Sequence, residues 1–317
     1  MADVVSLGEL LIDFNYDGAN EDNYPIMSGH PGGAVGNFLA ALAKCGVSAA
    51  LIAKVGDDAL GHMLKKTIGD VGIDNSAVLI DPDYFTTLAF VTLDSTGDRE
   101  FSFARKPGAD TRLSFEEVPL QLIDEAKVFH IGTLSLTGEP VRTATRKAVA
   151  YAKSKGKLIS LDPNLRLPLW ASPEDAKREM LWALAQADIV KISDNEVEFL
   201  FDMTPEDGAK HIMDTFGAKL VFVTLGKDGC LFMNRNGVGR VPGYSVQTID
   251  TCGAGDIFGG SAMYGVLSSG KAPEELTEFE LRQITAFACA AAGLSTTKHG
   301  GIGSVPETAD VWKLMEQ

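Results

Sequence analysis

The sequence predicts an α/β fold in which helices cover both faces of a mainly parallel sheet. Three observations lead to this prediction: short apolar runs alternate with helical segments, glycines follow several helices, and the apolar runs lack the polar alternation of half-exposed strands. The chain has 317 residues, 45% of them hydrophobic and 22% charged, which is enough apolar material for a large core. Neither a linker-like composition nor an internal repeat divides it, so we predict one domain over residues 1–317.

The predicted elements follow one another in a regular order. They are strand 4–7, helix 35–45, strand 49–55, helix 59–71, strand 128–131, helix 141–155, strand 158–161, helix 173–187, strand 189–192 and strand 220–225. Gly46 is expected to end the first helix in the left-handed conformation, and Gly72 to end the second helix. Ser193 and Glu196 form a capping box that predicts another helix start after the strand at 189–192.

One stretch departs from this order. Thr86–Asp94 and Arg99–Arg105 are two predicted strands joined by a glycine-containing loop at 95–98. In the second strand Arg99, Phe101, Phe103 and Arg105 fall on one face by the period of two. Such a hairpin could simply pack its phenylalanines on the body. We interpret it, with the β-like segment at 13–29, as a small lid formed by about 12–30 and 86–106 that faces a ligand.

Charge and targeting patterns narrow the class of partner. Lys and Arg number 28 against 43 Asp and Glu, a formal charge of −15 that disfavours nucleic acid and anionic membranes as partners. No apolar run approaches the ~20 residues of a spanning helix. The N-terminus lacks the pattern of a signal peptide, and the four cysteines lack metal or redox spacing, so a cytoplasmic protein with reduced thiols is expected.

The most informative segment is Asp250–Gly260, which precedes a long helical run. Small residues at Gly253, Ala254 and Gly255 let backbone amides approach a ligand, and the helix adds free N–H groups and its positive dipole end. This pattern predicts an anion site that suits a phosphate. Asp256 lies in the first helical turn, where the dipole is expected to lower the pKa of its carboxyl group. There it could take a proton from a hydroxyl that attacks the phosphate.

The same segment has other interpretations. It could be a helix start whose glycines only allow close packing. Gly253-x-Gly255-x-x-x-Gly259 also matches a loose dinucleotide fingerprint, but that motif belongs after the first strand of a β-α-β unit and this one lies late in the chain. No Gly-x-x-x-x-Gly-Lys-Ser/Thr phosphate loop is present.

A second glycine-rich segment, 29–37, opens the first predicted helix. Gly32 and Gly33 allow a small polar ligand to reach backbone amides, and Asn37 offers both a donor and an acceptor. Asp13 follows the first strand and could accept hydrogen bonds from two sugar hydroxyls. Each feature alone is typical of a turn or a cap.

Together these motifs resemble the ribokinase-like (phosphofructokinase B type) carbohydrate kinases, over essentially the whole chain. Asp250-Thr251-x-Gly253-Ala254-Gly255-Asp256-x-Phe258 is similar to the C-terminal signature of that family, and Gly32-Gly33-x-x-x-Asn37 to its N-terminal one. Asn195-Glu196-x-Glu198 resembles its magnesium and phosphate motif. Thr224-Leu225-Gly226-x-x-Gly229 resembles its nucleotide-binding strand and turn.

Within the family the sequence looks most like the fructokinases. Phe101-x-Phe103-x-Arg105 with Gly108-Ala109-Asp110 resembles their lid, and His130–Ser135 their central strand end. Asp162-Pro163-Asn164-Leu165-Arg166 with Trp170 resembles their Asp-x-Asn-x-Arg segment.

The resemblance implies a ribokinase-like three-layer α/β/α core and a set of site residues. Asp256 would deprotonate the primary hydroxyl of the sugar, and the amides of Gly253, Ala254, Gly255 and Asp256 would stabilise the charge on the γ-phosphoryl group. The implied sugar ligands are Asp13, Gly32, Gly33, Asn37, Phe101, Phe103 and Arg105, with Arg166 between sugar and phosphate. The implied ATP ligands are Asn164, Asn195, Thr224, Gly226, Gly229, Gly253 and Gly255.

Cations and assembly are implied in the same way. Glu198 would act on Mg²⁺ through water, because this hard cation tends to keep its waters. A monovalent-cation loop, with K⁺ as the ion, would comprise Asp250, Cys252, Ser295, Gly300 and Ser304. Lid edges that pair between subunits imply a homodimer.

The leading hypothesis is an ATP-dependent kinase that phosphorylates D-fructose at its 6-hydroxyl. The nearest alternative is a 2-keto-3-deoxygluconate kinase, whose substrate carries a carboxylate that Arg105 and Arg166 could also serve. A ribokinase or nucleoside kinase is a weaker alternative. Two other classes are a catalytically silent sugar-binding regulator of the same fold and a nicotinamide-dependent oxidoreductase.

Overall fold

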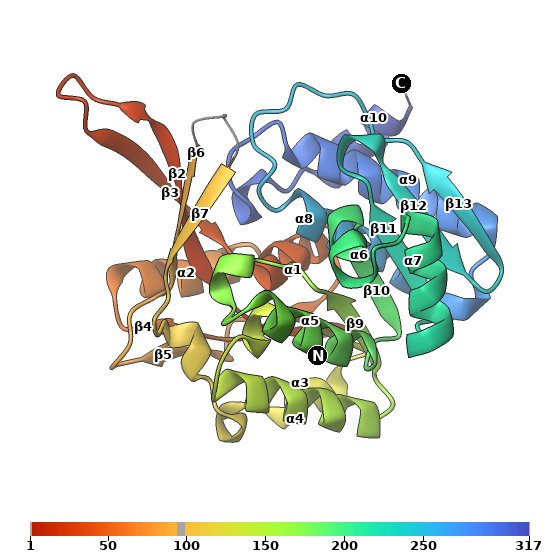
Figure 1. Ribbon diagram of the computed structural model, residues 1–317, viewed down its shortest axis with the longest axis horizontal. Coiled ribbons are helices and arrows are strands. Elements are labelled where there is room, and N and C mark those ends of the chain that lie inside the picture. The colour runs from red at the N-terminus through yellow and green to blue at the C-terminus, as the bar shows by residue number, and fades with distance from the viewer. Residues whose placement is uncertain (1, 94–98, 317) are drawn as a thin grey trace.

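The computed structural model describes residues 2–93 and 99–316, except for the side chains at 93 and 99–101. Its main element is a nine-stranded sheet in the spatial order β13-β12-β11-β10-β9-β8-β1-β4-β5 (Figure 1). The strands are β1 (Val4–Leu7), β4 (Ala49–Gly56), β5 (Val78–Asp81), β8 (Val128–Gly132), β9 (Leu158–Asp162), β10 (Ile189–Ser193), β11 (Leu220–Thr224), β12 (Cys230–Asn234) and β13 (Gly237–Val241). Neighbouring strands from β11 to β5 are parallel, and β12 and β13 continue the sheet antiparallel.

Helices pack on both faces of this sheet. They are α1 (Ala34–Lys44), α2 (Ala59–Asp70), α3 (Leu120–Glu125), α4 (Val141–Ser154), α5 (Pro173–Leu184), α6 (Asp194–Phe201), α7 (Pro205–His211), α8 (Ala254–Ser268), α9 (Glu278–Ser295) and α10 (Thr308–Met315). One hydrophobic core packs the helices α3 through α7 against one face of the sheet. A second core packs α1, α2, α8 and α9 against the other face. Successive strand residues alternate between them: Val5 and Leu7 lie in the first core and Val4 in the second. The continuously apolar strands are therefore explained by burial on both faces.

A second, four-stranded sheet projects from the body (Figure 1). Its order is β3 (Pro25–Gly32), β2 (Leu11–Ala19), β6 (Leu88–Leu93) and β7 (Arg99–Ala104). The strands β2 and β3 form one antiparallel hairpin and β6 and β7 form another, and β2 pairs with β6 in parallel. The predicted loop at 95–98 lies outside the described residues.

The predicted α/β fold is confirmed, and each predicted helix and strand has a counterpart within a few residues. The predicted helix 173–187 ends at Leu184. The hairpin of β12 and β13 was not predicted, although Asn236-Gly237 at its turn is a hairpin signal. In β13 two glycines and Arg240 interrupt the sequence, so this strand lacks the continuous apolar run that marks the strands of the parallel part of the sheet.

The order of the strands fixes where a ligand site can form. From β1 the chain moves to β4 and β5 on one side, then to β8, β9, β10 and β11 on the other. The crossovers diverge between β1 and β8, so loops at the carboxyl ends of these strands leave a crevice, which is where ligands bind in open α/β sheets.

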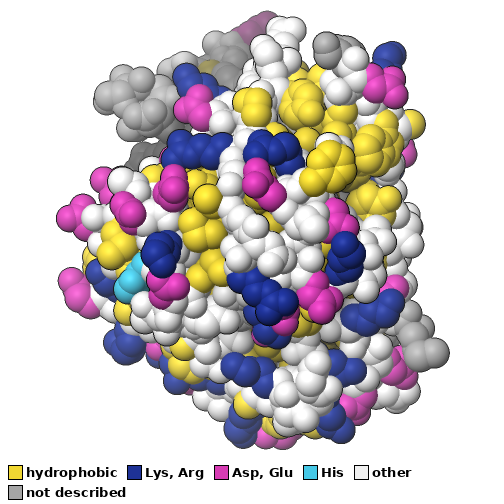
Figure 2. Space-filling view, turned by 90° about the vertical axis from the view of Figure 1, so that its right-hand side faces the viewer, with side chains coloured by type: hydrophobic (Ala, Val, Ile, Leu, Met, Phe, Trp, Pro, Cys, Tyr) yellow, Lys and Arg dark blue, Asp and Glu magenta, His cyan; other side chains and the backbone are white. Residues whose placement is uncertain are grey.

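Surface charge and hydropathy add two facts. Basic and acidic side chains are interspersed on the face shown in Figure 2, so the net charge of −15 is not gathered there into one acidic patch. Among the described residues no helix is long and apolar enough to cross a membrane.

Candidate active site

A cavity lies at this divergence point, with about 470 Å³ of empty space including the part open to solvent. Its walls come from segments far apart in the chain: the loop after β1, the start of β2, the N-termini of α1 and α8, and the loops after β8 and β9. The lining residues are Glu9, Leu11, Asp13, Gly33, Ala34, Asn37, Phe103, Leu134, Asn164, Arg166, Cys252, Gly253 and Asp256. The two glycine-rich segments singled out by the sequence therefore meet at one site.

Asp256 is held between two amide side chains. Its Oδ1 accepts a hydrogen bond from Asn164 Nδ2 at 2.6 Å, and its Oδ2 accepts one from Asn37 Nδ2 at 2.8 Å. Asn164 adopts a positive φ of 50°, a conformation that Asn tolerates better than most residues and that positions its amide here. Asn37 comes from the first turns of α1, so three elements orient one carboxylate.

Burial raises the pKa of Asp256 from 3.8 to about 6, while Lys191, the Asn37 amide and Arg166 act in the opposite direction. The prediction that the helix dipole lowers this pKa is therefore wrong. Asp256 is only 7% exposed, and the loss of water around the charged form outweighs the dipole. A carboxyl group with this pKa is largely ionised at neutral pH and still basic enough to accept a proton.

The glycines before Asp256 allow close approach of backbone. Gly253 has a φ of 74°, and a Cβ there would lie 2.9 Å from Gly301 Cα. A Cβ at Gly255 would lie 2.7 Å from Lys191 Nζ, which places a buried ammonium group directly beside the N-terminus of α8. The Ala254 amide donates a 3.3 Å hydrogen bond to Thr251 O. This helix start therefore combines its dipole with a positive side chain.

Lys191 belongs to a buried group of charges that the sequence reading missed. Its Nζ lies 3.0 Å from Asp162 Oδ2, and both side chains are buried. Glu196 completes the predicted capping box with Ser193 and also accepts a hydrogen bond from the Leu165 amide at 2.7 Å. It thereby fixes the loop that carries Asn164. The available signal was a lysine in the middle of one apolar strand and an aspartate at the end of the strand before it.

Asp13 lies across the cavity, where burial raises its pKa to about 6 against the opposing effect of Arg166. A Cβ at Gly32 would lie 2.2 Å from Asp13 Oδ2, so only glycine fits beside this carboxyl group. Gly32 thus supports Asp13 and does not itself line the cavity. Gly33, with φ at 116°, does.

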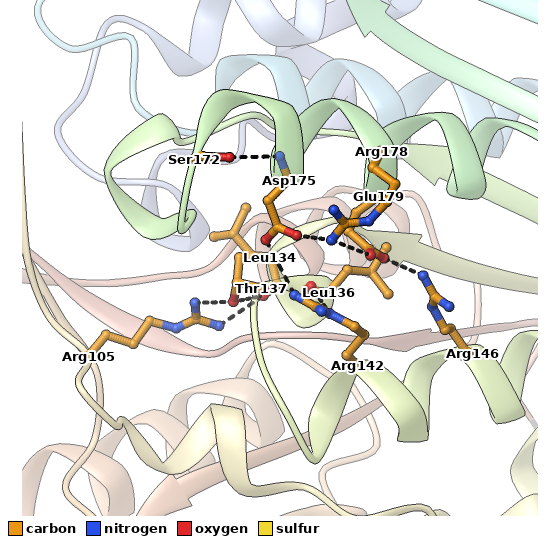
Figure 3. A network of polar contacts seen from close by, with 10 residues as sticks. All are labelled: Arg105, Leu134, Leu136, Thr137, Arg142, Arg146, Ser172, Asp175, Arg178 and Glu179. Carbon is orange, nitrogen blue, oxygen red and sulfur yellow. Dashed lines mark hydrogen bonds and ion pairs between the residues drawn. The ribbon is translucent and has the colours of Figure 1, made fainter.

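Arg105 does not line this cavity. The strand β7 ends at Ala104, so the period of two that placed Arg105 beside Phe103 does not extend to it. Its Nε and Nη2 donate to Asp110 Oδ2 at 2.8 and 2.6 Å, and its other contacts are Thr137 Oγ1 and Leu134 O (Figure 3). The guanidinium group of Arg105 is therefore already paired with the carboxylate of Asp110. Phe103 lines the cavity. Phe101 was also predicted to contact the sugar, but its side chain lies outside the described part of the structure.

The residues implied for the nucleotide lie further along the same sheet edge. Thr224 ends β11, and Gly226 and Gly229 form the turn into β12. Gly229 has a φ of 96°, and a Cβ there would lie 2.0 Å from Val241 O. Asn195 and Glu198 are exposed on α6, after β10. Asn164, also implied for the nucleotide, lines the cavity and donates its amide to Asp256.

The residues implied for a monovalent cation cluster around Asp250. This buried carboxylate accepts hydrogen bonds from the Cys252 amide, the Gly300 amide and Asn15 Nδ2 at 2.9 to 3.2 Å. Ser295 and Ser304 donate to backbone carbonyls nearby. Asp250 therefore organises these loops, and an ion there would depend mainly on backbone carbonyl oxygens.

Four further lining residues were missed: Glu9, Leu11, Ala34 and Leu134. Glu9 is the most informative of them. It interrupts an apolar run between Leu7 and Leu10, and an acidic residue in such a run was the signal.

A model of the pfkB family carbohydrate kinases matches residues 1–308. The chain belongs to this family. The kinase is 42% identical over 318 residues to fructokinase-1 of Zea mays, covering 99% of this chain and 98% of that protein.

Solved structures agree with this assignment. The kinase superposes on a fructokinase with bound ATP from Xylella fastidiosa with a TM-score of 0.90, at 26% identity, covering 100% of this chain and 99% of the other. It superposes on a fructokinase double mutant from Vibrio cholerae O395, bound to fructose, ADP and potassium ion, with a TM-score of 0.89 at 30% identity, covering 99% and 98%. The predicted ribokinase-like family and fold are therefore confirmed.

Proposed function

We propose that this kinase transfers the γ-phosphoryl group of ATP to the 6-hydroxyl of D-fructose. The observation that carries the proposal is Asp256, a buried and largely ionised carboxylate held by two amides at the N-terminus of a helix. Its environment suits a general base beside a phosphate. The full-length similarity to fructokinases supports fructose as the acceptor.

In the proposed mechanism Asp256 accepts the proton of the sugar hydroxyl as the oxygen attacks phosphorus. Asn37 and Asn164 keep its two oxygens in place, so little reorganisation is needed when the proton moves. The amides of Gly253, Gly255 and Asp256, with Lys191 behind them, stabilise charge on the transferred group, and the Ala254 amide would have to share its long hydrogen bond to Thr251 O to join them. Arg166 would act between sugar and phosphate.

The charges around the cavity favour a neutral sugar over a sugar acid. Glu9, Asp13 and Asp256 line it, and Arg166 is the one cationic side chain among its described lining residues. Arg105, which could have received a substrate carboxylate, is engaged by Asp110. A 2-keto-3-deoxygluconate carboxylate would therefore meet mostly like charges, which disfavours it.

The nucleotide would lie over the ends of β10 and β11, on Asn195, Thr224, Gly226 and Gly229. Bound Mg²⁺ would neutralise phosphate charge, and the exposed oxygen-bearing side chains of Asn195 and Glu198 suit water-mediated contact with it. K⁺ would be held by carbonyl oxygens of the loops that Asp250 organises.

We further propose that the four-stranded sheet is the lid of a single kinase domain. It supplies Asp13 and Phe103 to the cavity, which supports a closing role. Its outer strands β3 and β7 have one unpaired edge each within the described residues, and Ile26 in β3 and Tyr24 just before it are exposed. These edges suit pairing with a second copy as a homodimer. Four cysteines kept as reduced thiols would suit the cytoplasm.

The proposal is tested by ADP release from purified protein with Mg-ATP and, separately, fructose, 2-keto-3-deoxygluconate, ribose, glucose and adenosine. We expect the highest kcat/KM with fructose. A higher kcat/KM with 2-keto-3-deoxygluconate would overturn the proposal that fructose is the substrate. The absence of turnover with every acceptor would overturn the proposed kinase activity.

A further inference from the structure

Glu9 is a carboxyl group in the cavity that the mechanism above does not use. It follows β1 at the point where the crossovers diverge, is only 2% exposed, and lines the cavity together with Asp13 and Asp256. A carboxylate in such a place costs free energy unless its oxygens are satisfied. The contacts of its two oxygens therefore indicate what it does.

The first oxygen has a structural partner. Glu9 Oε1 accepts a 2.7 Å hydrogen bond from the amide of Ala34, the first residue of α1. The residue at the N-cap position is Gly33, which has no side chain to satisfy that amide. Glu9 thus caps α1 from a distant strand end and fixes the helix that carries Asn37.

The second oxygen has no such partner. Glu9 Oε2 is buried and makes no hydrogen bond to any of the described residues. The nearby guanidinium of Arg105 donates to Asp110, Thr137 and Leu134 instead. Burial raises the pKa of Glu9 to about 7, against the effect of the amides of Glu9 and Ala34. Within the described part of the chain this oxygen therefore lacks a donor, and the residue that carries it lines the cavity proposed for the sugar.

We propose that Glu9 Oε2 accepts a hydrogen bond from a hydroxyl of the bound sugar and so selects a neutral polyol over a sugar acid. This inference rests on the proposed function of the site. The contact involves a hydroxyl other than the one phosphorylated, since Asp256 occupies that role. A hydroxyl donor satisfies the buried oxygen, whereas a substrate carboxylate in the same place would bring two negative charges together.

The test is Glu9→Gln, which keeps an acceptor for Ala34 and replaces Oε2 with an NH₂ group. We expect KM for fructose to rise at least about tenfold, since hydrogen bonds to charged groups are the stronger kind, with kcat within about threefold and KM for ATP unchanged. Glu21→Gln, an exposed substitution in the turn between β2 and β3, is the matched control and should leave all three constants unchanged.

Analogues that each lack one hydroxyl show which one Glu9 binds: 1-deoxy-, 3-deoxy- and 4-deoxyfructose and 2,5-anhydromannitol. One analogue should raise KM in the wild type and cause no further rise in Glu9→Gln, which a purely structural role for Glu9 would not produce. Equal losses in both proteins for every analogue would overturn the inference.

Failure of the inference is distinguishable from failure of the proposed function. A wild type that phosphorylates fructose, with Glu9→Gln unchanged in KM, refutes only the role of Glu9. A wild type inactive on fructose refutes the function itself. If Glu9→Gln does not fold, the wild-type series decides: unchanged KM for all four analogues would exclude a hydroxyl contact of this kind.

Discussion

Replacing Asp256 with asparagine tests the base assignment most directly. The variant keeps the shape of the side chain but cannot accept a proton, and general-base catalysis contributes about 10²- to 10⁴-fold. One of the two amides, from Asn37 or Asn164, would also face an NH₂ group and have to rotate. We therefore expect Asp256→Asn to lose at least about 10²-fold in kcat.

Asp256→Asn should not lower the free energy of unfolding, although it lowers kcat. The pKa of Asp256 is raised from 3.8 to about 6, so its ionisation above pH 6 costs the folded state roughly 3 kcal/mol. Asparagine removes this cost, while the amide conflict offsets part of it. The free energy of unfolding at pH 8 should thus be no lower than that of the wild type, and lost turnover cannot be attributed to unfolding.

The assay is ADP release coupled to a spectrophotometric readout, with thermal unfolding and calorimetric fructose binding on the same preparations. Fructose affinity should stay near that of the wild type. Retention of turnover within about tenfold of the wild type would contradict the role of Asp256 as the base.

Three further predictions concern this site and the packing of α8 behind it. Because Asp256 must be ionised to accept a proton, kcat/KM for fructose should fall about tenfold per pH unit as pH drops below about 6; a flat profile from pH 5 to 8 would count against this base. Gly260→Ala would bring a Cβ within 2.2 Å of Phe38 O, which should force α8 away from α1 and lower the free energy of unfolding by about 1–3 kcal/mol. Gly303→Ala is the matched control, because a Cβ there has no atom within 4 Å. Equal stability of the two variants in urea would refute the argument. Because burial raises the pKa of Glu9 from 4.5 to about 7, ionising Glu9 lowers the stability of the folded state as pH rises through this range. Glu9→Gln should therefore raise the free energy of unfolding at pH 8 by about 1–3 kcal/mol and change it little at pH 4.5. A variant less stable than the wild type at pH 8 would show that the charge is needed for folding.

Local patterns in the sequence predicted the frame of the kinase well. Strand β1 and helix α1 are each specified by their own residues, through apolar runs and stop glycines. The box of Ser193 and Glu196 is specified in the same way, since its two partners are three residues apart. Such features need no knowledge of distant segments, and for that reason they could be read from the chain alone.

The functional details depended on distance in space. Arg105 was expected at the sugar but pairs with Asp110, because β7 ends one residue earlier than the alternation suggested. Asn164 was expected at the nucleotide, and its contact with Asp256, 92 residues away in the chain, was not foreseen. The contact of Asn164 has no signature in the sequence around it, whereas Arg105 and Asp110 are only five residues apart and belong to one motif whose internal pairing was overlooked.

The sequence by itself determined the α/β order, the two glycine-rich segments and the carboxylate that follows one of them. Tertiary structure alone decided the electrostatics of that carboxylate. Asp256 begins a helix, which by local reasoning lowers its pKa, yet atoms from α1, β9 and β10 exclude water from it and raise the pKa to about 6. Desolvation is a sum over everything that packs around a group, and that sum exists only once the chain has folded.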